Sequence, residues 1–256
     1  MIGRREFALG GLISIVFGAS PCCTAHAQPR VHATRGCWIA DDDIDSIYPD
    51  GTDTRLYING NEPMIPRSGD RDFDYALAQT LGKCSTYLNA APGFAYYDDF
   101  DGLNAYATPK VRLNGADGTV LFGQGLLQKL MKSQDHPDLS VAAVCAHEFG
   151  HILQFKLNLF ERVKAGQPTV KRPELQADFF SGYFSGLRKK EKPDFPAAVF
   201  AMTQYSFGDN MINSPNHHGT PDERAAAIVR GFEAGYRENK NLNDAIQTSI
   251  NYVSYL

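Results

Sequence analysis

The spacing of apolar residues divides the chain into a strand-rich part followed by a helical part. Between residues 93 and 124, short apolar runs are broken by Asp-Gly and Asn-Gly pairs, a pattern typical of strands joined by turns. After Gln124 the apolar positions recur every three or four residues, as on one face of a helix. The expected strands are 94–97, 103–107 and 119–122, and the expected helices are 70–88, 125–132, 140–156, 172–189, 194–206, 221–237 and 241–254. This order predicts a single α+β domain in which a small, mainly antiparallel sheet lies beside a helical bundle.

The beginning of the chain has the features of an export signal. Arg4 and Arg5 precede a mildly apolar stretch at 8–20, and Ala25-His26-Ala27 is a small-residue cleavage site. Paired arginines indicate a twin-arginine-type signal, and hence an exported protein that is periplasmic or secreted. An uncleaved membrane anchor is the alternative, although the stretch is shorter than the about 20 apolar residues that span a bilayer. The expected organisation is a signal peptide at 1–27, an irregular segment at 28–69 with a short strand at 55–58, and a domain at 70–256.

The charge of the chain bears on its possible partners, and its cysteines bear on a possible disulfide. The net charge is −4, which argues against a nucleic-acid partner. No long apolar run follows the signal, so we expect no integral membrane segment after cleavage. Cys37 and Cys84 are candidates for a disulfide in an oxidising compartment, and Cys145 is expected to be a small buried hydrophobe.

The strongest chemical motif lies within the expected helix at 140–156, for which Asp138 or Ser140 is the expected N-cap. His147-Glu148-Phe149-Gly150-His151 has the form H-E-x-x-H, which places two imidazoles one helical turn apart. Both histidines can then bind one Zn²⁺, and Glu148, rotated by about 100°, can act as a base toward a metal-activated water. The alternative is two core histidines and a buried acid, but an unpaired buried charge is costly.

A second acidic motif supplies a candidate third ligand. Glu174 and Asp178 lie one turn apart on the expected helix at 172–189, and the connection from His151 is long enough to bring that helix back. Glu174 would complete a two-His, one-Glu zinc site, and Asp178 would accept the free ring N–H of a ligating histidine. The alternative is an exposed acidic edge near a helix N-terminus. The aromatic residues that follow Asp178 favour burial of this helix.

These motifs together resemble a known family. His147 to His151 followed by Glu174-x-x-Ala-Asp178 resembles the gluzincin zinc peptidases, and Glu174 to Asp178 is also similar to the bacterial neutral zinc metallopeptidases. Residues 104–107 and 118–127 resemble two strand motifs of the family that contains the CAAX prenyl endopeptidases and bacterial membrane-associated quality-control peptidases. The resemblance covers residues 94 to 232. It implies a zincin-like fold, one catalytic Zn²⁺, and a strand at the cleft rim that hydrogen-bonds an extended peptide through Asn104, Ala105, Tyr106 and Ala107.

A late motif extends the resemblance with one departure. His218 and Arg224 keep the spacing of the family's His-Pro to Arg motif, but Gly219 stands where the family has proline. The resemblance implies that His218 or Arg224 stabilises the oxyanion formed when water attacks a peptide carbonyl. The alternative is a histidine near a helix N-cap at Thr220 and a solvated arginine. Tyr183 and Tyr205 are rival proton donors.

The sequence therefore predicts an exported zinc endopeptidase that hydrolyses polypeptides. Two other interpretations stay open. One is a zinc-containing binding or chaperone-like protein of the same fold without turnover, and the other is zinc-dependent hydrolysis of a non-peptide amide or ester. An edge strand at Asn104 would favour a polypeptide substrate over these. Neither the oligomeric state nor the cleavage specificity follows from the sequence.

Overall fold

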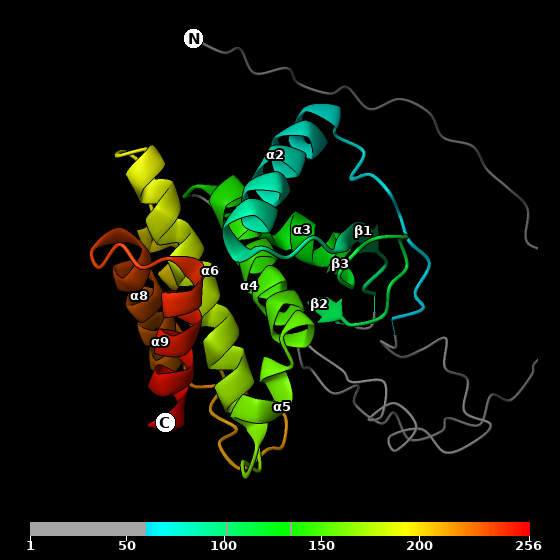
Figure 1. The fold of residues 1–256 in the computed structure, drawn as a ribbon. Coiled ribbons are helices and arrows are strands. Elements are labelled where there is room, and N and C mark those ends of the chain that lie inside the picture. The colour runs from blue at the N-terminus through cyan, green and yellow to red at the C-terminus, as the bar shows by residue number, and fades with distance from the viewer. Residues whose placement is uncertain (1–59, 101, 134) are drawn as a thin grey trace, which may run out of the picture. The chain divides into compact units, whose positions relative to one another are not determined.

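The structure is a computed structural model that describes residues 60–100, 102–133 and 135–256 (Figure 1). The expected signal peptide, the strand at 55–58 and Cys37 lie outside the described residues. Within them the fold is α+β. The elements in chain order are α2 (Arg71–Leu88), β1 (Gly93–Tyr97), β2 (Ala105–Thr108), β3 (Thr119–Gly123), α3 (Gln124–Leu130), α4 (Pro137–Lys156), α5 (Leu159–Lys164), α6 (Lys171–Glu191), α7 (Ala198–Ser206), α8 (Pro221–Tyr236) and α9 (Leu242–Ser254).

The three described strands form a mixed sheet with the order β1-β3-β2. β1 pairs with β3 in parallel, with Gly93 opposite Thr119, and β2 pairs with β3 in antiparallel fashion. The expectation of a mainly antiparallel sheet is therefore wrong. The physical reason is that β1 and β2 do not form a hairpin, because β3 inserts between them and leaves β2 at an edge.

The helices agree with the apolar periodicity in number and order, except for the short α5. That helix lies within the connection between the two motifs, where no helix was expected. α4 begins earlier than predicted, with His136 at the N-cap and Pro137 in the first turn, where the missing N–H of proline costs nothing. Thr220 caps α8, and the side chains of Thr220 and Glu223 each accept a hydrogen bond from the backbone N–H of the other.

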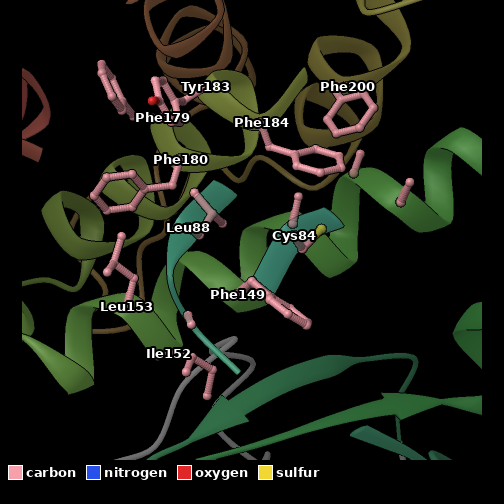
Figure 2. Packing of buried hydrophobic residues seen from close by; sticks show 14 of the residues in the cluster. Cys84, Leu88, Phe149, Ile152, Leu153, Phe179, Phe180, Tyr183, Phe184 and Phe200 are labelled. Carbon is pink, nitrogen blue, oxygen red and sulfur yellow. The ribbon is translucent and has the colours of Figure 1, made fainter. Parts of the chain in front are cut away.

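α4 lies at the centre of the described structure, between the sheet and α6 (Figure 1). It is buried from Ser140 to Gln154, which explains why that stretch is apolar on all sides. Phe149, Ile152 and Leu153 of α4 pack with aromatic residues of α6 and with Leu88 of α2 (Figure 2). Among the described helices, none is both long and apolar enough to cross a membrane.

Small residues allow α6 to approach both of its neighbours closely. A Cβ on Gly150 of α4 would lie 3.0 Å from the Cα of Ala177 on α6, and a Cβ on Gly231 of α8 would lie 1.9 Å from the carbonyl oxygen of Phe179. A side chain at either position would push the helices apart. These two crossings set the positions from which α4, α6 and α8 present their polar side chains to one another.

Candidate metal centre

His147, His151 and Glu174 come together in the interior and form a group that could hold a metal ion. One ligand atom from each lies within 4.8 Å of the others, and all three residues are buried. The two Nε2 atoms are 3.1 Å apart, His147 Nε2 lies 3.4 Å from Glu174 Oε2, and His151 Nε2 lies 3.5 Å from Glu174 Oε1. Four-coordinate zinc with bonds of about 2.0–2.1 Å keeps its donors about 3.3 Å apart. The donor set and its spacing therefore fit a tetrahedral ion.

The imidazole rings are oriented by hydrogen bonds on their far sides. His147 Nδ1 lies 2.8 Å from Asp178 Oδ1, and His151 Nδ1 lies 2.8 Å from Gln154 Oε1. Both partners are acceptors, so each ring carries its proton on Nδ1 and keeps the Nε2 lone pair directed toward Glu174. This tautomer is the one required for metal binding through Nε2.

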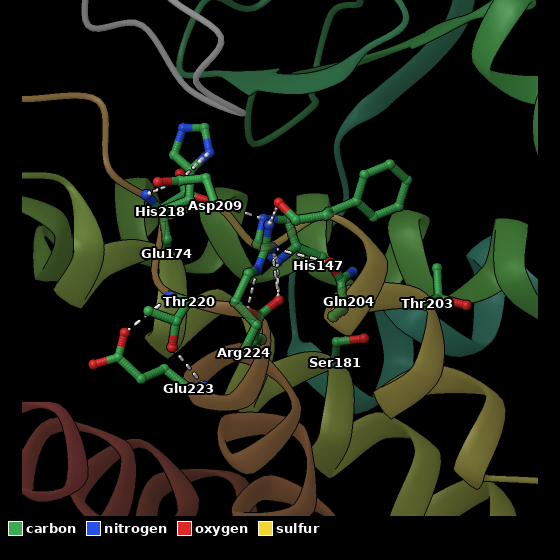
Figure 3. A network of polar contacts seen from close by, with 12 residues as sticks. His147, Glu174, Ser181, Thr203, Gln204, Asp209, His218, Thr220, Glu223 and Arg224 are labelled. Carbon is green, nitrogen blue, oxygen red and sulfur yellow. Dashed lines mark hydrogen bonds and ion pairs between the residues drawn. The ribbon is translucent and has the colours of Figure 1, made fainter. Parts of the chain in front are cut away.

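Arg224 of α8, which is labelled in Figure 3 near His147, in turn holds Asp178. Arg224 Nε lies 2.7 Å from Asp178 Oδ2 and Nη2 lies 2.9 Å from Oδ1, while Nη2 also donates to Gln204 Oε1 at 2.9 Å. Burial alone would raise the pKa of Asp178, but the Arg224 guanidinium and His147 lower it overall. Arg224 is 1% exposed, so the alternative of a solvated arginine is wrong. The Arg224 guanidinium contacts the Asp178 carboxylate.

Gln154, for which the sequence predicts no role, orients the second histidine. Gln154 Nε2 donates to the Pro173 carbonyl at 2.8 Å and to Gln176 Oε1 at 3.0 Å, and Gln176 Nε2 donates to Ser249 Oγ at 2.9 Å. This chain of buried amides links α4 to α6 and α9. The sequence signal that could have indicated this role is a single polar residue near the end of an apolar run, three positions after His151.

We expect Gln154→Leu to weaken metal binding, assayed with Zn²⁺, by about 10- to 100-fold, the usual effect of removing a residue that orients a ligand. The side chains are similar in size, so the change removes the acceptor of the His151 N–H rather than the packing. Competition with a chromogenic chelator measures the affinity. Gln79→Leu on the exposed face of α2 is the matched control and should leave the affinity unchanged. Equal affinities of Gln154→Leu and wild type would show that the hydrogen bond has no such role.

Glu148 lies beside the ligands without a hydrogen bond of its own. It is fully buried, and neither carboxylate oxygen has a hydrogen-bond partner in the described structure. Burial raises the pKa of Glu148 to about 7. Ile152, one turn later on the same side of α4, reaches Gly118 beside the sheet. Glu148 therefore faces the side of α4 that lies between the ligands and the sheet.

His218 reaches the same region from the loop before α8. Its Nε2 is buried and forms no hydrogen bond within the described structure, and it does not belong to the three-residue ligand group. Burial lowers the pKa of His218, and Glu174 partly offsets this effect by attraction. Of the rival tyrosines, Tyr183 donates its hydroxyl to the Lys240 carbonyl at 2.9 Å, and Tyr205 is 50% exposed.

Buried polar atoms without hydrogen bonds gather at this site. Among the described residues there are five such side-chain atoms, and four of them belong to Glu148, Glu174 and His218. Buried polar atoms are normally satisfied, so such a concentration indicates a place for a metal, water or polar ligand.

β2 forms one edge of the described sheet, and all four of its residues are buried. The Gly123 N–H donates to the Asn104 carbonyl at 2.9 Å and Ala105 lies opposite Phe122. In an antiparallel pair this register turns the N–H and C=O groups of Ala105 and Ala107 away from β3. No strand of the described part pairs with that edge. The Asn104 N–H, by contrast, is bound to the buried carboxylate of Asp99 at 3.2 Å.

β2 packs against α4. Ala105 belongs to the apolar cluster that contains Val144 and Cys145 of α4, and Ala107 belongs to the cluster that contains Phe149 and Ile152. β2 therefore shares its apolar clusters with the part of α4 that contains Glu148.

Comparisons with protein-family models, with curated proteins and with solved structures found no match to this chain.

Proposed function

We propose that the protein is a zinc-dependent endopeptidase with a zincin-like fold of the gluzincin type. The observation that carries this proposal is the buried group of His147, His151 and Glu174 with the hydrogen-bond-free carboxylate of Glu148 beside it. Two imidazoles and one carboxylate are the ligand set of many catalytic zinc sites, in which the fourth position is left for water or substrate.

The residues around the group suit hydrolysis of an amide. Zinc, when bound by these three ligands, supplies a Lewis acid that polarises the carbonyl and lowers the pKa of water toward about 7. Glu148, whose pKa burial raises to about 7, accepts the proton of the attacking water and returns it to the leaving amine. His218 donates from Nε2 to the oxyanion when that nitrogen carries the ring proton. Arg224 acts through Asp178 and is a positioning residue.

The position of β2 at an edge of the described sheet supports an extended polypeptide as the substrate. A chain added to this edge would exchange hydrogen bonds with Ala105 and Ala107, on a strand that packs against α4. A small amide or ester would not need such an edge. A non-catalytic zinc protein would not need a carboxylate buried without a hydrogen bond, since burial of an unpaired acid costs stability. We further propose export to the periplasm or medium, on the strength of the twin-arginine-type signal at 1–27.

Digestion of casein, an unfolded protein, tests the function. We expect the purified protein to cleave casein, a chelator to abolish cleavage, and an equimolar addition of Zn²⁺ to restore it. Internal fragments seen by mass spectrometry would identify an endopeptidase. Chelator-resistant cleavage would contradict a metal mechanism, and absence of cleavage by zinc-loaded protein would favour the non-catalytic alternative.

A further inference from the structure

The loop that carries His218 is closed at its base. It runs from the end of α7 to the start of α8, and the Asp209 N–H donates to the Gly219 carbonyl at 3.0 Å. The Val170 N–H donates to the Pro215 carbonyl at 3.0 Å, which ties the loop to the residue before α6. Its tip carries Met211 and Ile212, which are 57% and 62% exposed. Apolar packing at the tip therefore contributes little to holding the loop in place.

One carboxylate inside the loop binds three groups of the loop itself. Asp209 Oδ1 lies 2.6 Å from His217 Nδ1 and accepts the Met211 N–H at 2.8 Å, and Oδ2 accepts the His218 N–H at 3.0 Å (Figure 3). Burial alone would raise the pKa of Asp209, but these hydrogen bonds lower it overall. Asp209 is therefore an ionised acceptor that binds the ring of His217 and the backbone N–H of His218.

We propose that Asp209 is a positioning residue that holds His218 with its Nε2 directed at the reacting carbonyl. The inference rests on the proposed function, in which His218 stabilises the oxyanion. Donors that act on an oxyanion must be fixed before the reaction, because a donor that reorients during the reaction stabilises it less. The buried Nε2 of His218 has no hydrogen-bond partner within the described structure, and the backbone N–H of His218 is held by Asp209.

A double-mutant cycle tests this inference in the zinc-loaded protein. We expect His218→Ala to lower kcat by about 10²- to 10³-fold, the usual cost of one lost oxyanion donor. Asp209→Ala should lower kcat by about tenfold or more with little change in KM or zinc stoichiometry, yet have no further effect when His218 is already Ala. Asp209→Asn, which keeps an acceptor, should recover part of the loss. The control Asp222→Ala, on the exposed first turn of α8, should leave kcat unchanged.

The result that overturns the inference is an equal loss of kcat on Asp209→Ala in both backgrounds, because that would show a general structural role. An independent readout does not require activity. In protein with isotope-labelled histidines, Asp209→Ala should shift the ring resonances of His217 and His218 and leave those of His147 and His151 in place. Unshifted His218 resonances would refute the inference even if the wild-type protein had no peptidase activity, a result that would by itself refute the proposed function.

Discussion

Glu174→Ala is expected to abolish stoichiometric zinc binding. The change removes the charged member of a three-ligand group and leaves two imidazoles whose Nε2 atoms lie 3.1 Å apart. Two neutral ligands bind zinc far more weakly than three with a carboxylate, since the carboxylate offsets part of the charge of the ion. Elemental analysis after dialysis against micromolar Zn²⁺ should give one ion per wild-type chain and none per variant chain.

The matched control is Glu161→Ala, which removes an exposed glutamate from α5. It should keep one zinc ion per chain. Because Glu174 is buried among groups arranged around it, circular dichroism of the variant must show that the helices are retained. Full zinc occupancy in a folded Glu174→Ala protein would remove Glu174 from the ligand set.

Arg224→Ala is expected to destabilise the protein by about 3–5 kcal/mol, the usual cost of breaking a buried ion pair by removing one partner. The penalty arises because Asp178 is 0% exposed and would lose both guanidinium hydrogen bonds. It would then be a buried charge with His147 as its remaining hydrogen-bond partner. Urea denaturation measures the free energy of unfolding. Zinc affinity should also fall, since Asp178 orients His147.

Arg230→Ala on the same helix is the control. Arg230 pairs with Glu238 at a partly exposed position, and such pairs contribute at most about 1 kcal/mol. If Arg224→Ala were no more destabilising than Arg230→Ala, the buried network around Asp178 would not have the importance that its geometry indicates.

The helical part of the fold was predictable because its signals are local. Apolar periodicity located α2, α3, α4, α6, α7, α8 and α9, and Thr220 marked the start of α8. The strand order was not predictable, because the insertion of β3 between β1 and β2 depends on contacts between residues far apart in the chain. The Asp-Gly and Asn-Gly pairs between the strand-like runs suggested β-hairpins, but β1 and β2 do not pair with each other.

Some features of the candidate site were likewise predictable from the sequence, and others were not. The positions of His147, His151, Glu174 and Asp178 follow from spacings of three or four residues on two helices. The contacts of Arg224 with Asp178 and of Gln154 with His151 require knowledge of how the helices cross. Those crossings depend on Gly150 and Gly231, whose significance appears only once the neighbouring backbone is in place.

The measurement that tests the account most directly compares wild type with Glu148→Gln, each with verified stoichiometric zinc, in digestion of casein. The substitution keeps the shape of the side chain and removes the base, while the ligands His147, His151 and Glu174 stay intact. We predict cleavage by wild type and a loss of about 10²- to 10⁴-fold in the variant, the range for removal of a general base. Equal cleavage by both proteins, with equal zinc content, would contradict a peptidase centred on this site.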